Sequence, residues 1–258
     1  MDISAYLQRI HYQGSLKPTL QTLRALHEAH LLAVPFENLS IHLGQPIHLQ
    51  EEALYEKIVH RRRGGFCYEL NGLLAWLLRQ LDFQVSLLSA EVANDGEGFS
   101  PAFDHLALAI HQLDGTDWLA DVGFGASFRR PLGLEPEQEQ EDVDGQVYRL
   151  VREDEGEKTA HAYWIMQQRG ESGWEAQYRF TLQPYALSDF TARCSYQQTS
   201  PQSHFTQKRI CSLATQQGRI TLSDWQFITT SQGARTEQIL TSQEEYSAAL
   251  VNHFGITL

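Results

Sequence analysis

The sequence predicts an α+β fold in which helices come first, a mostly antiparallel sheet or barrel follows, and a small mixed section ends the chain. Two observations predict it. Apolar residues recur every three or four positions over roughly the first 80 residues, and from Val85 the period changes to two. With 258 residues, 42% of them hydrophobic, the chain is long enough for a large core. We expect three subdomains, at residues 1–83, 84–190 and 191–258.

The helical section repeats its apolar period in three segments. The residues at helical spacing are Leu20, Leu23, Leu26, His27 and Leu31, then Leu54 and Ile58, then Leu70, Leu73, Leu74, Leu77, Leu78 and Leu81. Pro35 and Pro46 mark the breaks between helices, because proline cannot continue one. The third stripe is the most regular in the chain and follows Gly64-Gly65.

The middle section is expected to form short strands. Residues alternate in character over 87–91, 106–110 and 118–122, and Asp114-Gly115 between the last two indicates a hairpin turn. Further strands are predicted at 147–151, 163–167 and 178–182. The acidic, glutamine-rich stretch 135–146 interrupts the pattern, and we expect it to be a loop.

The end of the chain combines predicted strands with one helix. Candidate strands lie at 210–214, 220–222, 226–230 and 236–240. The helix is expected to begin with a capping box in which Thr241 and Glu244 satisfy each other's backbone amides. It continues through Phe254 and ends at Gly255.

The negative charge of the chain is concentrated in one segment. The formal net charge is −12, and the stretch from Glu135 to Glu157, with ten acidic residues against two arginines, supplies −8 of it. The one basic run, 61–63, is too short to follow a phosphate backbone. We therefore expect no nucleic-acid partner.

Cysteine usage and the apolar stretches predict a soluble cytoplasmic protein with no membrane partner. The start lacks the features of a signal peptide, and the apolar stretch at 73–78 is far shorter than a bilayer crossing. The three cysteines cannot all pair. Cys194 and Cys211 are expected in strand or loop contexts, away from helix N-termini, and are taken as unreactive.

Cys67 is the candidate nucleophile. The glycines at 64 and 65 allow a turn that delivers Cys67 to the first turn of the leucine-striped helix. There the helix dipole and unpaired amides favour a thiolate. The alternative is a small core residue, since free cysteine is among the most buried residue types.

A nucleophilic cysteine needs a base and an orienting group, and His105 and Asp121 are the candidates. They lie on the two strands of the predicted hairpin. A regular two-residue turn at Asp114-Gly115 would point the two side chains to opposite faces. We therefore expect either a loop with an odd number of residues or a bulge in the ladder.

Five separated motifs together resemble the arylamine N-acetyltransferases. They are Val34-Pro35-Phe36-Glu37-Asn38-Leu39, Arg63-Gly64-Gly65-Phe66-Cys67-Tyr68-Glu69-Leu70-Asn71, Asp104-His105-Leu106, Asp121-Val122-Gly123-Phe124-Gly125 and Ser200-Pro201-Gln202-Ser203-His204-Phe205. They occur in the family's order and cover nearly the whole chain. The acidic stretch 135–146 has no counterpart that we can map. The chain stops at Leu258, whereas many bacterial members continue, which leaves the shape of the acceptor pocket open.

The resemblance implies a helical bundle, a β-barrel and an α/β lid, with a triad of Cys67, His105 and Asp121. It implies acetyl-coenzyme A as donor and an arylamine, arylhydrazine or N-hydroxyarylamine as acceptor, in a ping-pong reaction through acetyl-Cys67. The family's substrate-binding positions correspond to Phe36, Tyr68, Phe124 and Phe205, and Gly123 and Gly125 are candidates for contact with the coenzyme. Each of these aromatics is equally suited to a core position.

Two other functions remain as alternatives. A papain- or transglutaminase-like thiol hydrolase or amide exchanger also orders Cys, His and Asp along its chain. A non-catalytic binding module would use the acidic stretch 135–146 to engage a basic partner. The histidines and cysteines lack metal-ligand spacing, so we expect no metal. Glu37 and Arg63 are expected to form a structural ion pair, and the chain is expected to be a monomer or homodimer.

Overall fold

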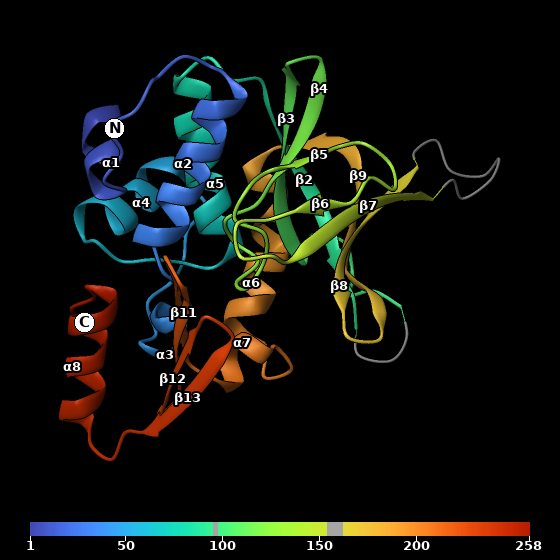
Figure 1. Cartoon of the computed structure of the whole chain (residues 1–258). Helices are drawn as coiled ribbons and strands as arrows, with labels where there is room; N and C mark the ends of the chain where they lie inside the picture. Colours follow the sequence, from blue (N-terminus) through green and yellow to red (C-terminus); the bar gives the residue numbers. More distant parts are fainter. Residues whose placement is uncertain (95–97, 154–161) are drawn as a thin grey trace.

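The structure is a computed structural model and describes residues 1–94, 98–153 and 162–258. The helices are α1 (Ile3–Arg9), α2 (Leu20–Ala33), α3 (Leu39–His42), α4 (Glu51–Tyr55), the π-helical turn η1 (Glu56–His60), α5 (Cys67–Gln80), the 3-10 turn η3 (Leu187–Phe190), α6 (Thr191–Thr199), α7 (His204–Gln207) and α8 (Gln243–Phe254). In Figure 1, α1, α2, α4 and α5 group beside the large sheet, and α8 lies with the C-terminal strands below them. The fold is α+β, as predicted.

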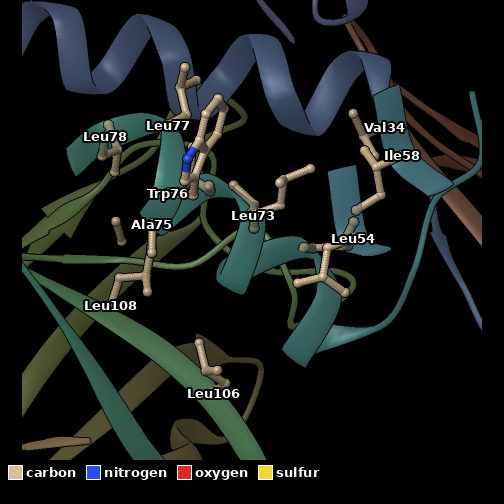
Figure 2. Close-up of a cluster of buried hydrophobic side chains, with 14 of the residues drawn as sticks. Val34, Leu54, Ile58, Leu73, Ala75, Trp76, Leu77, Leu78, Leu106 and Leu108 are labelled. Atoms are coloured by element: carbon tan, nitrogen blue, oxygen red, sulfur yellow. The ribbon is translucent and has the colours of Figure 1, made fainter. Parts of the chain in front are cut away.

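Helix α5 is the centre of the helical layer. Its N-terminus is held by Glu69, whose carboxylate accepts a hydrogen bond from the Phe66 amide at 3.2 Å. The leucines within α5 are completely buried, and Figure 2 shows Trp76 and Leu77 toward α2 and Leu106 and Leu108 on the opposite, sheet side. Each buried leucine contributes about 1.5–3 kcal/mol relative to an exposed one. This packing fixes the helix that begins at Cys67.

The large sheet is an antiparallel, nearly closed barrel of eight strands in the order β5-β4-β3-β2-β9-β8-β7-β6. Its strands are β2 (Val85–Val92), β3 (His105–Leu113), β4 (Thr116–Ala120), β5 (Leu132–Gly133), β6 (Gln140–Glu141), β7 (Val147–Glu153), β8 (Tyr163–Gly170) and β9 (Gly173–Tyr185). The two edge strands meet through one side chain. Gln140 Oε1 accepts from Gly133 N at 2.7 Å, and Gln140 Nε2 donates to Gly133 O at 3.0 Å.

The stretch 135–146 is therefore not only a loop, which corrects the sequence-based expectation. It contains β6, and Gln140 pairs with Tyr148 of β7. The strand cannot be recognised from its acidic and glutamine residues. It has only two residues and lies at the edge of the sheet, where no apolar alternation is needed.

The β3–β4 hairpin confirms the predicted irregularity. Asp114 and Gly115 form a two-residue turn with φ angles of 53° and 83°. Leu113 pairs with Thr116 beside the turn, and Ile110 pairs with Trp118. Between these two pairs β3 has two residues where β4 has one. The β-bulge adds one residue to β3. Beyond it, His105 and Asp121 can therefore point to the same face of the sheet, which a regular ladder from a two-residue turn would not allow.

A second antiparallel sheet has the order β1-β10-β11-β12-β13. Its strands are β1 (Phe36–Glu37), β10 (Ile210–Thr215), β11 (Gly218–Ser223), β12 (Gln226–Ser231) and β13 (Ala234–Ile239), and its core is shared with α8. Strand β1 comes from the helical section, and Phe36 pairs with Ser212. The C-terminal section is thereby joined to Phe36, which also bridges to Gly65 in the loop before Cys67.

Two local expectations are corrected at this end of the chain. The N-cap of α8 is Ser242, whose hydroxyl accepts from Glu245 N at 3.2 Å, so the predicted Thr241–Glu244 box is displaced by one residue. Cys194 lies inside helix α6. Within the described part of the chain, no helix has the length and apolar character that crossing a bilayer requires.

Candidate active site

The loop before Cys67 is shaped by the close approach of β1. A Cβ atom on Gly64 would lie 1.8 Å from the carbonyl oxygen of Pro35, so only glycine fits there. Gly65 then exchanges backbone hydrogen bonds with this segment, accepting from Glu37 N at 2.8 Å and donating to Pro35 O at 3.3 Å. Gly64 is therefore required by backbone contact, whereas a Cβ on Gly65 would lie 2.6 Å from Cβ of Glu69 in the first turn of α5.

A buried ion-pair network supports the same loop. Arg63 Nη2 lies 2.9 Å from Glu37 Oε1, which confirms the predicted pair, and Lys57 Nζ lies 2.7 Å from Glu69 Oε1. Burial works to raise the pKa of Glu37, but Lys57, Arg63 and the Leu39 amide outweigh it and hold that pKa below its usual value. The network joins β1, η1 and the start of α5.

His105 and Asp121 meet across the hairpin. His105 is the first residue of β3, Asp121 follows β4, and His105 Nε2 lies 2.7 Å from Asp121 Oδ2. The other carboxylate oxygen accepts from Asn71 Nδ2 and Gly123 N, both at 2.8 Å. Burial works to raise the pKa of Asp121, but His105 and these donors lower it below its usual value.

Cys67 is 4% exposed, and its surroundings act on the thiol in opposite directions. Burial raises the pKa of Cys67 well above its usual value, and the negative charge of Asp121 adds to this, whereas a backbone hydrogen bond from Leu106 lowers it. A thiolate at this position therefore needs a positive charge beside it. The imidazole of His105, with Nε2 bound to Asp121, keeps Nδ1 for a partner in the same cleft.

The cleft has a volume of about 340 Å³ and reaches Cys67. Six of the predicted site residues line it: Phe36, Cys67, His105, Gly123, Phe124 and Phe205. Polar side chains complete the wall, among them Asp104, Asn94 and His204. The cleft thus combines a thiol, an imidazole and aromatic faces in one space. Cys194 and Cys211, by contrast, lie outside it, and burial raises the pKa of Cys194 to about 12.

The aromatic residues divide into two groups. Phe36 and Phe205 lie with ring centroids 6.2 Å apart, and Phe124 packs edge-on against His105 at 5.1 Å. Tyr68 is completely buried, and its hydroxyl donates to Phe103 O at 2.8 Å, so it supports the wall from behind and does not line the cleft. Gly125, with φ of +83°, also lies outside the lining.

Asn71 and Tyr178 are parts of the site that sequence reasoning did not identify. Asn71 lies in the buried face of α5 and donates to Leu106 O at 2.6 Å as well as to Asp121. The ring of Tyr178 lies 5.1 Å from that of His105, and burial together with the negative charge of Asp121 raises the pKa of its hydroxyl well above the usual value. A polar residue in an apolar helical stripe was the signal available for Asn71, whereas nothing in the pattern of β9 distinguishes Tyr178.

No group of three or more His, Cys, Asp or Glu side chains within residues 1–94, 98–153 and 162–258 is placed to hold a metal ion. Cysteine, histidine and aspartate lie together instead. These three residue types, brought together in one site, are an arrangement typical of cysteine-dependent acyl-transfer and hydrolytic enzymes.

Comparison with known proteins narrows this class. An N-acetyltransferase family model matches residues 19–258. The arylamine N-acetyltransferase / N-hydroxyarylamine O-acetyltransferase of Salmonella typhimurium is 36% identical over 239 residues, which are 92% of this chain and 82% of that protein. The chain belongs to the arylamine N-acetyltransferase family.

Solved structures of the family have the same fold. The arylamine N-acetyltransferase from Salmonella typhimurium superposes with a TM-score of 0.91 at 33% identity, covering 98% of this chain and 90% of that one. The Mycobacterium marinum arylamine N-acetyltransferase in complex with CoA superposes with a TM-score of 0.87 at 32% identity, covering 99% and 93%.

Proposed function

We propose that the protein transfers an acetyl group from acetyl-coenzyme A to an arylamine, arylhydrazine or N-hydroxyarylamine through an acetyl-Cys67 intermediate. The observation that carries the proposal is the cleft in which Cys67 and His105 lie beside the rings of Phe36 and Phe205. Membership of the arylamine N-acetyltransferase family supports it, as does the CoA complex of the Mycobacterium marinum relative.

The first half of the reaction charges the enzyme. His105 takes the proton of Cys67, and the resulting imidazolium supplies the positive charge that a buried thiolate needs. Asp121 holds the ring through Nε2 and stabilises its charged form. The thiolate attacks the thioester carbonyl, the bond to the coenzyme sulfur breaks, and coenzyme A leaves as a thiol with the proton from His105. The first backbone amides of α5 are suitably placed to stabilise the oxyanion.

The second half discharges the enzyme onto the acceptor. The amine attacks the carbonyl of acetyl-Cys67, His105 takes its proton, and the Cys67 sulfur leaves. Phe36, Phe124 and Phe205 supply the faces against which a flat aromatic acceptor packs. Gly123 lines the cleft beside Cys67, and its lack of a side chain lets the segment pack directly against the Cys67 backbone.

Intact-mass measurement after brief exposure to acetyl-coenzyme A, without acceptor, tests the proposal. We expect the mass to rise by one acetyl group in the wild type and in Cys194→Ala, and to stay unchanged in Cys67→Ala. Steady-state kinetics with acetyl-coenzyme A and an arylamine should then give parallel double-reciprocal lines. Peptide turnover without coenzyme A, and no acetylation, would establish the thiol hydrolase instead.

Alkylation by iodoacetamide measures the proposed role of His105. Removing the imidazole in His105→Ala leaves the buried thiol without its counter-charge, so its apparent pKa should rise to the free value of about 8.5 or above. The wild type should react well below that pH. Equal rates for the wild type and His105→Ala from about pH 5 to 9 would show that His105 does not activate Cys67.

A further inference from the structure

His27 of α2 is a completely buried polar side chain that connects the helical layer to the site. Its Nδ1 lies 2.8 Å from the carbonyl oxygen of Arg129, and its Nε2 lies 3.1 Å from the backbone nitrogen of Asp121. The ring stacks on Phe128 with an interplanar angle of 9° and a centroid distance of 5.8 Å. One imidazole therefore binds both ends of the segment 121–129.

Nε2 also lies 3.1 Å from the Asp121 carbonyl oxygen, so each ring nitrogen faces a carbonyl oxygen, which only accepts. A neutral ring has one proton; we assign it to Nδ1 because the contact with Arg129 O is the shorter, at 2.8 Å, and Nε2 then accepts from the Asp121 amide. The groups facing the ring are the Asp121 carboxylate, the backbone of residue 129 and His30 on the same helix. Burial outweighs the favourable contacts and lowers the pKa of His27 to about 4, so the ring is neutral at pH 7.

The segment 121–129 carries three parts of the site. Asp121 supplies the carboxylate that binds His105, Phe124 packs against the His105 ring, and Gly123 lines the cleft. Residues 121–129 lie outside any regular strand or helix, so no ladder of backbone hydrogen bonds holds them. Their position depends on individual contacts such as those of His27.

We propose that His27 is a positioning residue, which clamps the segment 121–129 so that Asp121 keeps its hydrogen bond to His105. This inference rests on the proposed function, because it assigns to His27 an effect on the His105–Asp121 pair. His27 touches neither the cleft nor Cys67. Its influence passes through the backbone of Asp121.

Two variants separate the two ends of the clamp. In His27→Asn the amide nitrogen replaces Nδ1 and still donates to Arg129 O, but the acceptor for the Asp121 amide is lost. In His27→Gln the longer side chain places its oxygen near the position of Nε2, so the Asp121 bond is kept and the Arg129 bond is lost. The activity should therefore fall more in His27→Asn than in His27→Gln.

His30 is the matched control. It lies one turn further along α2, is equally buried, and its Nδ1 is paired with the Tyr6 hydroxyl at 2.9 Å, away from the segment 121–129. His30→Asn removes the same number of atoms as His27→Asn. We expect a comparable loss of stability with kcat and the pH profile of Cys67 alkylation unchanged per folded molecule.

The decisive readout is the pH profile of iodoacetamide alkylation, normalised to the folded fraction. We expect His27→Asn to react about tenfold more slowly than His30→Asn at pH 7, the factor that corresponds to one lost buried hydrogen bond, with its profile shifted to higher pH. Coincident profiles for the two variants would overturn the proposal. If His27→Asn does not fold, the same comparison is made between His27→Leu and His30→Leu, because leucine also removes the acceptor for the Asp121 amide.

Hydrogen exchange at the Asp121 amide tests the clamp without the reaction. Protection should fall in His27→Asn and persist in His27→Gln and His30→Asn; unchanged protection in His27→Asn would also overturn the proposal. If the wild type reacts no differently from His105→Ala, the proposed function fails, whereas the exchange result still decides whether His27 holds Asp121.

Discussion

Asn71 Nδ2 lies 2.8 Å from Asp121 Oδ1, and this contact joins the helix that begins at Cys67 to the carboxylate that holds His105. The same amide group donates to Leu106 O, and its oxygen accepts from Val122 N at 2.9 Å. A single side chain thus sets the position of α5 against both strands of the hairpin. Cys67 at the start of α5 and the His105–Asp121 pair are thus connected by one buried hydrogen-bond cluster.

Asn71→Ala should remove this cluster's centre. Three buried hydrogen bonds are lost and their partners stay without water, so we expect a loss of about 3 kcal/mol in the free energy of unfolding and a fall in turnover of the remaining folded protein. Urea unfolding and steady-state kinetics measure both. Asn252→Ala, on the exposed side of α8, is the control and should change neither. A loss below about 1 kcal/mol in Asn71→Ala would contradict the central role of the amide.

Gly123→Ala and Gly125→Ala should differ sharply. A Cβ on Gly123 would lie 2.6 Å from Cys67 Cα, a backbone atom that cannot turn aside, whereas a Cβ on Gly125 meets open space and encounters only the strain of φ +83°. We expect Gly123→Ala to lose acetylation of Cys67 by acetyl-coenzyme A, and Gly125→Ala to lose about 1 kcal/mol of stability with activity retained. Equal acetylation rates in the two variants would refute the argument from close packing.

Asp121→Asn should slow turnover by less than the factor of about 10⁴ known for the corresponding change in a serine triad. The asparagine keeps a hydrogen bond to His105 but removes the charge that stabilises the imidazolium. In the proposed mechanism a thiolate–imidazolium pair forms before substrate arrives, so part of the loss should appear as a shift in the alkylation profile. A loss of turnover without any such shift would mean that Asp121 acts only later in the reaction.

Glu37→Gln should make stability less dependent on pH in acid. The folded pKa of Glu37 is lower than its unfolded value near 4.5, so its charge stabilises the fold above that pH, and this contribution disappears as the pH falls through the folded pKa. The variant should be less stable by about 3–5 kcal/mol at pH 7, because Arg63 loses its partner, and the difference should narrow below about pH 4.5. Denaturant unfolding over a pH series measures it; a difference that stays constant down to about pH 3 would argue against the ion pair.

Phe205→Ala should weaken the acceptor and spare the donor. The Phe205 ring packs against Phe36 at 6.2 Å and Phe66 at 5.5 Å, away from Asp121, so its loss opens the aromatic face without touching the His105–Asp121 pair. We expect the KM for an arylamine to rise about tenfold while the rate of Cys67 acetylation stays near the wild-type value. A similar fall in both half-reactions would place the ring on the coenzyme's path instead.

The hydrophobic period of the sequence predicts the helices and strands that are determined by their own residues. The stripe from Leu70 to Leu81 locates α5, and the parity of His105 and Asp121 anticipates the bulge in β3, because side-chain alternation is a property of the strand itself. The strand at 140–141 escapes prediction because pairing with a neighbour, and not its own residues, makes it a strand.

The site divides along the same line. Cys67 can be identified as a candidate because it follows two glycines at the start of a helix, where the helix dipole and unpaired amides favour a thiolate. The functions of Asn71 and His27 depend on which atoms the fold brings beside them, and those atoms belong to residues 35 or more positions away. Their sequence context shows only polar residues on apolar helix faces, which is compatible with any buried hydrogen bond.

The pairing of β1 with β10 has a consequence for how the molecule forms. Phe36 bridges Gly65 on one side and pairs with Ser212 on the other, so the loop before Cys67 is completed by a strand from the last fifth of the chain. Contacts between such distant residues close late in folding, because the entropy of closing the intervening chain must be overcome first. A chain emerging from the ribosome therefore carries Cys67, His105 and Asp121 long before it carries the strand that completes their surroundings.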